Sequence, residues 1–539
     1  MIALFYEKRV TLLYCVIVFA CALLLARLYN LAKPETNKSM EVLTGQYTAR
    51  LDVCERNGFV YDTNGLLLSH EKSGKVAIVN PGECVDALGC AYALSEYAVS
   101  DSASDIFEKI IDGVPFTVSL ARDSVVGGLP GVYVFDKYEE RNDIAKHFLG
   151  YNAERGGVSG LRLFYDEYLN KSEHHKVSVS FDTNAKRMSL SSFVTECQGY
   201  LSCDGLVTSI DRGLQTFCDS LEEEIGSGAV VVSDVDTGYI LALSSFPGYD
   251  VSNLSDILLS DKGELVNRTL QSFTPGSVFK MIVAASALEK DRALWDFCYT
   301  CNGEIEIDGN VFRCHKLSGH GEMTMKDAFA NSCNTYFISL GREIGIEKVA
   351  QTMKKLRLDE KTRADFLVES DSYFVDTDNK REGYLANISF GQGDLCLSPL
   401  DMIKVTNALS TGYLTPLSVI RGKIESGVFG GEKEIIRERI FSEETVGKML
   451  LMMKECVESG TGSGAKTKSL TTGGKTATAQ TGRFDEDGVE YVHKWFCGVA
   501  PIEKPKYSIL VLCDFSTNPD VSPSVIFSKI CAYLQENVF

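Results

Sequence analysis

The stretch Phe273-Thr-Pro-Gly-Ser-Val-Phe-Lys280 leads into a long run of apolar residues. From Val278 to Leu288 almost every residue is apolar or Ala, with no strand-like alternation and no Gly or Pro. This pattern predicts a helix that is apolar on all sides and therefore runs through a core rather than along a surface. Pro275-Gly276 precedes the helix, and such a pair is typical of a sharp turn. The stretch therefore predicts the central helix of a domain, entered through a turn.

Ser277 and Lys280 stand three residues apart, on one face of this helix, where their side chains can meet. Burial makes a charged lysine costly and lowers its pKa until it can act as a base. A serine hydroxyl beside a neutral amine is an activated nucleophile. Alternatively, Ser277 caps the helix and the Lys280 amine extends to water. Taken alone the stretch favours this second interpretation, because S-x-x-K is common by chance.

Two further short motifs change that balance. Ser332-Cys-Asn334 stands at the boundary of a predicted helix pair, where its first and third side chains converge if the backbone turns. Helix capping would explain the same residues. Lys475-Thr476 lies in a strand of small residues, Gly473 to Gly482, which another backbone or a ligand can approach closely. Each motif is weak, but the three in this order match the S-x-x-K, S-x-N and K-T-G set of serine acyltransferases.

On these motifs the chain resembles the class B penicillin-binding proteins, which are peptidoglycan D,D-transpeptidases. The resemblance is dense after Leu206 and thin between residues 66 and 145. Other segments that carry it are Arg56, Asp62-Thr-Asn-Gly65, Gly157-Val-Ser-Gly160-Leu161, Gly228 to Gly238, Asn267-Arg268, Gly319-His-Gly321, Gly391-Gln-Gly393, Ser398-Pro399 and Trp495-Phe496.

The order of predicted elements indicates an α+β fold after Leu206. Strands begin and end this region while helices fill its middle, which is typical of a mostly antiparallel sheet with helices. The resemblance implies the transpeptidase fold shared with serine β-lactamases, preceded by an α+β pedestal. We therefore predict a short cytoplasmic tail (1–9), a transmembrane anchor (10–28), a pedestal or dimerisation-type domain (34–205) and a transpeptidase domain (206–539).

The anchor is predicted from Val10 to Ala26, a run without charge that follows Lys8-Arg9. The run is just long enough to span a bilayer. Its short basic flank should remain in the cytoplasm, which places the catalytic domain outside. We favour an uncleaved single-pass anchor over a signal peptide, because no A-x-A cleavage site follows. A lipoprotein signal at Cys21 does not fit, because apolar residues continue beyond it.

The resemblance implies acyl transfer, with Ser277, Lys280, Ser332, Asn334 and Lys475 as the catalytic residues. Ser277 would attack the carbonyl between the two terminal D-Ala residues of a stem peptide, and Lys280 would take its proton. Ser332 would relay that proton to the leaving amine. β-Lactam antibiotics would acylate the same Ser277. No cofactor is implied.

Asn334 and Lys475 would also contact the substrate, together with the substrate-binding residues Thr476, Ala477 and Thr478. The resemblance implies that Asn334 bonds its backbone amide, while Lys475 and Thr476 bind its terminal carboxylate. The backbone N–H groups of Ser277 and Thr478 would form an oxyanion hole, which stabilises a transition state by roughly 3–4 kcal/mol. The third K-T-G position holds Ala477 instead of Gly. If its methyl faces the cleft, we expect altered β-lactam affinity with activity retained.

Charge and composition limit the partners. The chain of 539 residues has a formal net charge of -19 and a pI near 5.0. Nucleic-acid binding needs a basic face, and none is visible in the sequence. The expected partners are stem peptides, β-lactams, the membrane and a separate glycosyltransferase. The alternative functions are a catalytically silent scaffold of the wall-synthesis complex, or a β-lactamase or β-lactam sensor that shares the site.

Two other sequence patterns are similar to a zinc site and to a phosphate-binding loop, but we predict neither ligand. Cys298-x2-Cys301, Cys314-His315 and His320 approach zinc-finger spacing. The resemblance explains the Gly-His-Gly segment without a metal, so we favour a Cys301–Cys314 disulfide or free thiols and expect no metal. Gly473-Gly-Lys-Thr476 is similar to a phosphate-binding loop, but Ser469 stands where that loop needs Gly.

Overall fold

The computed structural model describes residues 14, 16–27, 29, 48–54, 58–153, 155–169, 175–180, 193–195, 205–371, 373–425, 428–518 and 520–537. They fall into two compact units. The first comprises Met1–Arg56, Lys72–Glu139 and Glu173–Tyr200, and the second comprises Asn57–Glu71, Glu140–Ser172 and Leu201–Phe539. These bounds differ from a single division near residue 205, because two segments of the expected pedestal belong to the second unit.

A long-range strand pairing explains the first of these segments. β2 (Phe59–Tyr61) pairs in parallel with β10 (Gly205–Thr208), which also pairs with β20 (Ile420–Glu425). β21 (Val428–Phe429) completes this four-stranded sheet. The pairing joins segments that are far apart in the sequence, and no local pattern predicts such contacts.

The described part of the predicted tail and anchor is short. Tyr14, residues 16–27 and Tyr29 are helical and exposed. Within the described ranges, no helix combines the length and apolar character needed to cross a membrane. The other residues of 1–47 lie outside the described ranges, so the anchor stays a prediction.

The first unit is an α+β module, as its alternating and acidic segments predict. One sheet has the order β1 (Thr48–Cys54), β8 (His175–Ser180), β9 (Phe193–Thr195), and another has β4 (Phe116–Leu120), β3 (His70–Val79), β5 (Val132–Glu140). α3 (Ala87–Ser95) and α4 (Ala103–Ile111) form a core with β3 and β4. α4 begins at a capping box, in which Ser102 and Asp105 bond each other's backbone N–H.

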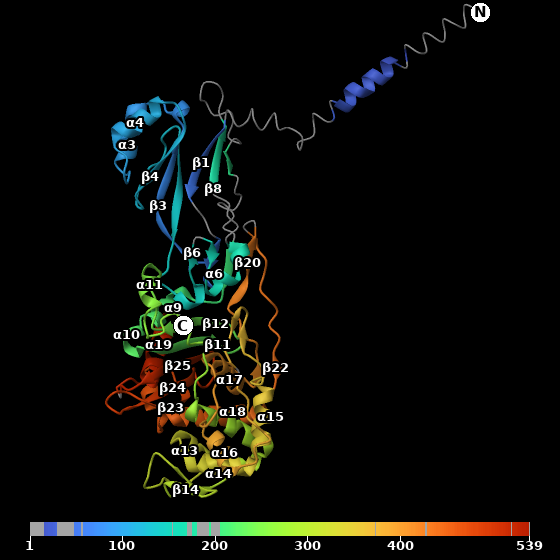
Figure 1. Ribbon diagram of the computed structural model, residues 1–539, viewed down its shortest axis with the longest axis vertical. Helices are drawn as coiled ribbons and strands as arrows, with labels where there is room; N and C mark the ends of the chain where they lie inside the picture. The colour runs from blue at the N-terminus through green and yellow to red at the C-terminus, as the bar shows by residue number, and fades with distance from the viewer. Residues whose placement is uncertain are drawn as a thin grey trace, which may run out of the picture. The chain divides into compact units, whose positions relative to one another are not determined.

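The second unit is built on a five-stranded antiparallel sheet, which confirms the α+β fold with a mostly antiparallel sheet predicted after Leu206. Its order is β12 (Ile240–Phe246), β11 (Gly228–Asp234), β25 (Tyr507–Ser516), β24 (Glu490–Ala500) and β23 (Gly473–Phe484). Figure 1 shows β11 and β12 beside β23 to β25, which come from the other end of the unit's sequence. Ala229 and Val231 of β11 join one core while Val230 and Val232 join another, so helices cover both faces of the sheet.

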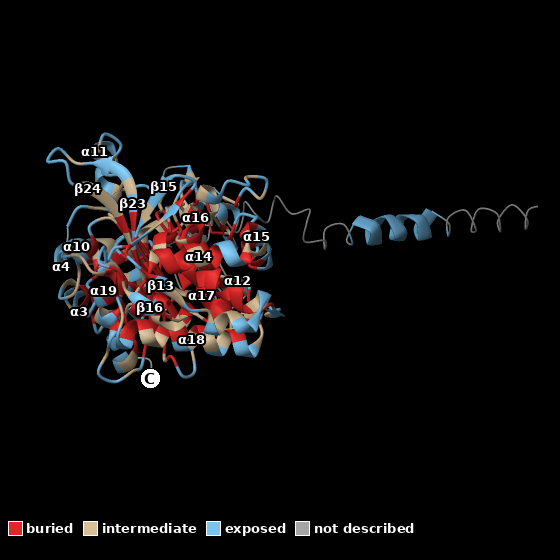
Figure 2. Cartoon of the chain, turned by 90° about the horizontal axis from the view of Figure 1, so that it is seen from below, coloured by how far each residue is buried: buried red, intermediate tan, exposed pale blue. Residues whose placement is uncertain are grey.

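α9 (Arg212–Asp219) and α19 (Pro523–Asn537) pack on one face, and α12 (Lys280–Lys290) lies in the core on the other. Every residue from Lys280 to Leu288 is buried, as the apolar pattern predicts. α14 (Asn334–Ile344), α15 (Ile346–Lys355), α17 (Pro399–Thr411) and α18 (Glu443–Glu458) contact α12. Figure 2 shows much of α14 and α17 in the buried colour at the centre of this unit.

The remaining elements of the second unit are short. They include α5 (Lys146–Leu149), β6 (Asn152–Ala153), β7 (Gly156–Gly157), α6 (Gly160–Phe164), α7 (Asp166–Leu169), α10 (Glu222–Ile225), α11 (Leu254–Ile257), β17 (Arg363–Ala364), β18 (Leu367–Val368), α16 (Glu382–Ser389), β19 (Tyr413–Leu414) and β22 (Glu438–Arg439).

Candidate active site

A 3-10 turn, η5 (Gly276–Phe279), places Ser277 at the start of α12. Gly276 has φ +54, in the left-handed region, as expected of the glycine in a sharp turn. Its N–H donates to Gly391 O over 2.9 Å, and a Cβ on Gly391 would collide with Gly276 O. Val278 and Phe279 are buried while Ser277 is partly exposed, so the turn presents only the serine to solvent.

The late strands of the sheet hold the segment before this turn. The Trp495 indole N–H on β24 donates to Thr274 O over 3.1 Å. The Trp495 ring also meets the Phe273 ring edge-on, with centroids 6.2 Å apart. Trp495 is almost fully buried, so its N–H needs such a partner. The strand therefore fixes the backbone just ahead of Ser277.

The S-x-N motif forms a tight turn between α13 (Met325–Ala330) and α14. Ser332 has φ +53, which strains a residue with a side chain by about 1 kcal/mol or more. Lys280 Nζ donates to Ser332 O and to Asn334 Oδ1, each over 2.8 Å, and lies 3.3 Å from Ser332 Oγ. The backbone turn predicted for this motif is present, and Lys280 joins the first two motifs.

Lys280 is suited to act as a base. Burial lowers its pKa well below the ordinary lysine value, and the charge of Lys475 lowers it further. A neutral amine has two N–H donors, which suit the Ser332 and Asn334 carbonyl oxygens, and a lone pair for a hydroxyl proton. Among the described residues no hydrogen bond joins Lys280 to Ser277 in this state.

The third motif lies on β23 beside the nucleophile turn. Lys475 is fully buried; its Nζ donates to Thr476 O over 3.0 Å and lies 5.7 Å from the centre of the Phe329 ring. Burial lowers the pKa of Lys475. Thr476 and Thr478 alternate with the buried residues of the strand. The Thr476 hydroxyl shares a hydrogen bond of 2.6 Å with the Thr461 hydroxyl.

A cleft of about 600 Å³ brings the motifs together. Of the residues predicted for the site, it is lined by Ser277, Ser332, Asn334, Thr476, Ala477 and Thr478. Lys280 and Lys475 are fully buried and are absent from its lining. The three sequence motifs thus contribute to one site, in which six residues line the cleft and two amines lie buried beneath it.

Several residues of the cleft lie outside the three motifs and were not predicted. These include His315, Phe390, Gln392, Thr461, Gln480, Lys494 and Trp495. Gln392 and Trp495 lie in segments that carry the family resemblance, so that signal was present in the sequence. No local pattern marks Thr461, whose role depends on a contact with a strand 15 residues later.

The methyl group of Ala477 packs below the nucleophile turn. Ala477 is 6% exposed and belongs to the main core. Its Cβ would lie 3.4 Å from a Cβ built on Gly276, and that of Ala479 would lie 3.0 Å away. The methyl therefore supports the turn that carries Ser277, and little of it is offered to a ligand.

We predict that Ala477→Gly lowers stability more than it alters acylation. Loss of a buried methyl and the added freedom of Gly should reduce the free energy of unfolding by about 1 kcal/mol. The penicillin acylation rate should change by less than about fivefold, since the cleft gains little room. Thermal denaturation and stopped-flow acylation measure the two effects, with Ala479→Gly as the matched control. A tenfold change in acylation at unchanged stability would show that the methyl contacts the ligand.

Comparison with known proteins identifies the domain that contains this site. The family profile of the penicillin binding protein transpeptidase domain matches residues 228–530. Stage V sporulation protein D of Bacillus subtilis is 28% identical over 491 residues, which cover 85% of this chain and 74% of the relative. The peptidoglycan D,D-transpeptidase MrdA of Acinetobacter baumannii is 26% identical over 525 residues, which cover 84% and 77%.

Solved structures share the fold. Penicillin-binding protein PBP2 of Helicobacter pylori superposes with a TM-score of 0.64 at 20% identity, over 91% of this chain and all of that one. Penicillin binding protein 3 of Mycobacterium tuberculosis, in complex with aztreonam, has the same score and identity over 91% and 98%. At this identity the likeness concerns the fold alone.

Proposed function

Because the chain belongs to the class B penicillin-binding protein family, we propose that it cross-links peptidoglycan stem peptides as a serine D,D-transpeptidase. One observation carries the proposal. Lys280 Nζ bonds both outer residues of the S-x-N turn, one helical turn from Ser277, beneath a cleft that Thr476 and Ala477 of the K-T-A strand help to line. The residues that we propose as nucleophile, base and proton relay, Ser277, Lys280 and Ser332, therefore adjoin one cleft, which supports the proposal.

Acylation would follow from this arrangement. Ser277 Oγ attacks the carbonyl carbon between the two D-Ala residues while its proton passes to Lys280. The tetrahedral oxyanion accepts from the backbone N–H groups of Ser277 and Thr478. The C–N bond then breaks, and the leaving amine takes a proton through Ser332. An amine of a neighbouring strand later attacks the ester, which forms the cross-link and restores Ser277.

Substrate binding would use the far wall of the cleft. The terminal carboxylate would accept from Thr476 Oγ1, which lies beside the hydroxyl of Thr461. Lys475 lies buried beneath, and a carboxylate nearby would raise its pKa again and favour the ammonium form. Asn334 would bond the substrate backbone amide. A β-lactam would open on Ser277 by the same attack, with its amine kept tethered.

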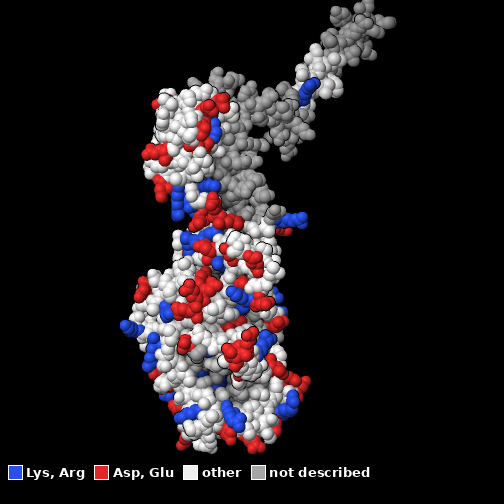
Figure 3. Space-filling view, turned by 60° about the vertical axis from the view of Figure 1, so that its left-hand side comes forward, with Lys and Arg blue, Asp and Glu red and all other residues white. Residues whose placement is uncertain are grey.

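The proposal also covers the cellular location of the enzyme and its partner enzyme. We place it at the cell membrane as a single-pass protein with an extracytoplasmic catalytic domain, supported by the charge-free run after Lys8-Arg9. Because no glycosyltransferase motif is found in residues 34–205, a separate glycosyltransferase would supply the glycan strands. On the described surface in Figure 3, Lys and Arg are interspersed with Asp and Glu, which suits a peptide rather than a nucleic acid.

The test is acylation followed by turnover. The protein is expected to be labelled by a fluorescent penicillin and to exchange the terminal D-Ala of a stem pentapeptide for a labelled D-amino acid. Failure of both reactions would favour the scaffold. Rapid release of hydrolysed penicillin would favour a β-lactamase, and slow release without exchange would favour a sensor.

A further inference from the structure

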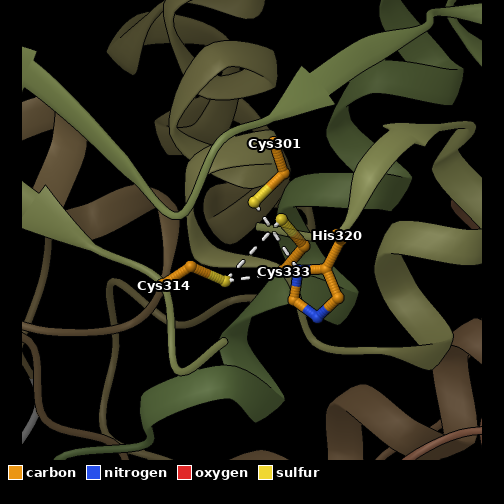
Figure 4. Close-up of side chains that lie close together, drawn as sticks. All are labelled: Cys301, Cys314, His320 and Cys333. Atoms are coloured by element: carbon orange, nitrogen blue, oxygen red, sulfur yellow. Dashed lines mark hydrogen bonds between the residues drawn. The ribbon is translucent and has the colours of Figure 1, made fainter. Parts of the chain in front are cut away.

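Four potential metal ligands converge behind the S-x-N turn. Cys301 ends β13 (Tyr299–Cys301), Cys314 follows β15 (Asn310–Arg313), His320 precedes β16 (Gly321–Met323), and Cys333 lies between α13 and α14. Their ligand atoms all lie within 4.8 Å of one another, and Figure 4 shows the side chains pointing toward a common centre. None of the three cysteines is more than 1% exposed.

The spacing of these atoms fits a tetrahedral metal site. Cys314 Sγ lies 3.9 Å from Cys333 Sγ, and His320 Nδ1 lies 3.5 Å from Cys314 Sγ and 3.6 Å from Cys301 Sγ. Zinc bonds of about 2.3 Å to sulfur and 2.0 Å to nitrogen place tetrahedral ligands about 3.8 Å (S to S) and 3.5 Å (S to N) apart. These three distances therefore match the separations that a shared zinc ion imposes, and the other ligand pairs lie within 4.8 Å.

A metal ion explains the convergence of all four side chains, whereas a disulfide explains that of only two. All three cysteines are free, which agrees with the free thiols rather than the Cys301–Cys314 disulfide that the sequence left as alternatives. One disulfide would in any case leave a third buried thiol beside His320. Cys298, which completes the apparent finger spacing in the sequence, is exposed and lies outside the cluster. Its place is taken by Cys333, 13 residues beyond His320.

We propose that Cys301, Cys314, His320 and Cys333 bind one structural Zn²⁺ ion. Four protein ligands close the tetrahedron and leave no position for a reacting water, so the ion is structural rather than catalytic. Each of the three thiols gives up its proton to solvent when it binds, and the site carries three thiolates and Zn²⁺ for a net charge of −1. This proposal replaces the sequence-based expectation of a metal-free region.

The position of Cys333 gives the ion a second role. Cys333 is the middle residue of Ser332-Cys-Asn334, and its backbone continues the turn in which Ser332 has φ +53. Ligation would tie this turn to two antiparallel strand pairs, β13 with β16 and β14 (Glu304–Ile307) with β15. Residues of these strands are mostly exposed, and the local core is small. The metal would thus hold Ser332 and Asn334 against Lys280. This role rests on the proposed function, whereas metal binding does not.

Metal content tests the site without any activity measurement. The full chain, purified without a metal-binding tag, is expected to contain about one zinc per molecule by plasma mass spectrometry. Chelation and reloading with Co²⁺ should produce the intense visible and thiolate charge-transfer absorption of a tetrahedral cobalt site. Zinc well below one per chain together with weak, octahedral-type cobalt absorption would overturn the proposal.

Variants locate the ion. Cys301→Ser and Cys314→Ser should each lose most of the zinc, while the matched control Cys298→Ser should retain it. Chelation of the wild type should lower the melting temperature by about 5 °C or more and slow penicillin acylation at least tenfold, both reversed by zinc. Unchanged zinc in both variants would overturn the site. If the protein contained zinc but was not labelled by penicillin, the metal site would be supported, and only its proposed role in catalysis would be excluded.

Discussion

Replacing Ser277 by Ala is expected to abolish labelling by a fluorescent penicillin. Removal of a nucleophile costs about 10⁴-fold or more in rate, because a covalent intermediate can no longer form. The fold should survive, since Ser277 is partly exposed just before α12 and its hydroxyl makes no hydrogen bond to any of the described residues. Gel fluorescence and intact-protein mass measure the loss, and the far-ultraviolet circular dichroism spectrum checks that the fold is kept.

Ser286→Ala provides the matched control for this variant. Ser286 lies on the same helix, but its hydroxyl donates to Ile282 O over 2.7 Å inside the core. This variant should keep the labelling of the wild type. If instead Ser277→Ala still gained the mass of one penicillin, another residue would be the nucleophile and the proposed mechanism would fail.

Replacing Lys280 by Met is expected to slow acylation by about 10³-fold, which is within the range for loss of a general base. Met fills a similar volume in the core, so the change chiefly removes the amine. The amine also bonds Ser332 and Asn334, and its loss should loosen the S-x-N turn as well. Stopped-flow acylation measures the rate. A variant that acylates within tenfold of the wild type would exclude Lys280 as the base.

The rate of acylation is expected to rise with pH. Protonated Lys280 cannot accept a proton, so the wild-type acylation rate should rise with pH as this group loses its proton. Because burial and Lys475 lower its pKa well below the ordinary lysine value, the rise should be complete well below the pH at which a free lysine titrates. In Lys280→Met this rising limb should be lost. Lys290→Met, at the exposed end of the same helix, should keep it.

Much of the site was predictable from local pattern. The apolar run after Val278 is a helix that is buried on all sides, and the Pro275-Gly276 pair forms the turn before it. Ser277, Ser332, Asn334 and Thr476 line one cleft, as the three motifs together imply. Helix periodicity and turn chemistry act over a few residues, so they can be recognised in the sequence itself.

Long-range packing decided the rest. The side on which Ala477 lies depends on the register of β23 against η5, and Thr461 enters the site only because its loop meets that strand. Residues 57–71 join the second unit through the parallel pairing of β2 with β10. Such contacts join segments distant in the sequence, and local propensity carries no information about them.

The stretch from Phe273 to Lys280, with the two later motifs, was enough to identify the family and to predict the nucleophile. The sequence alone could not assemble the proposed metal ligands, because finger spacing pointed to Cys298 while the fold brings in Cys333. A ligand set is defined by atoms that meet in space, and Cys333 meets Cys301 only when the S-x-N turn packs against the β13 hairpin. The tertiary structure therefore decided what supports the catalytic turn, whereas the sequence determined which residues stand on it.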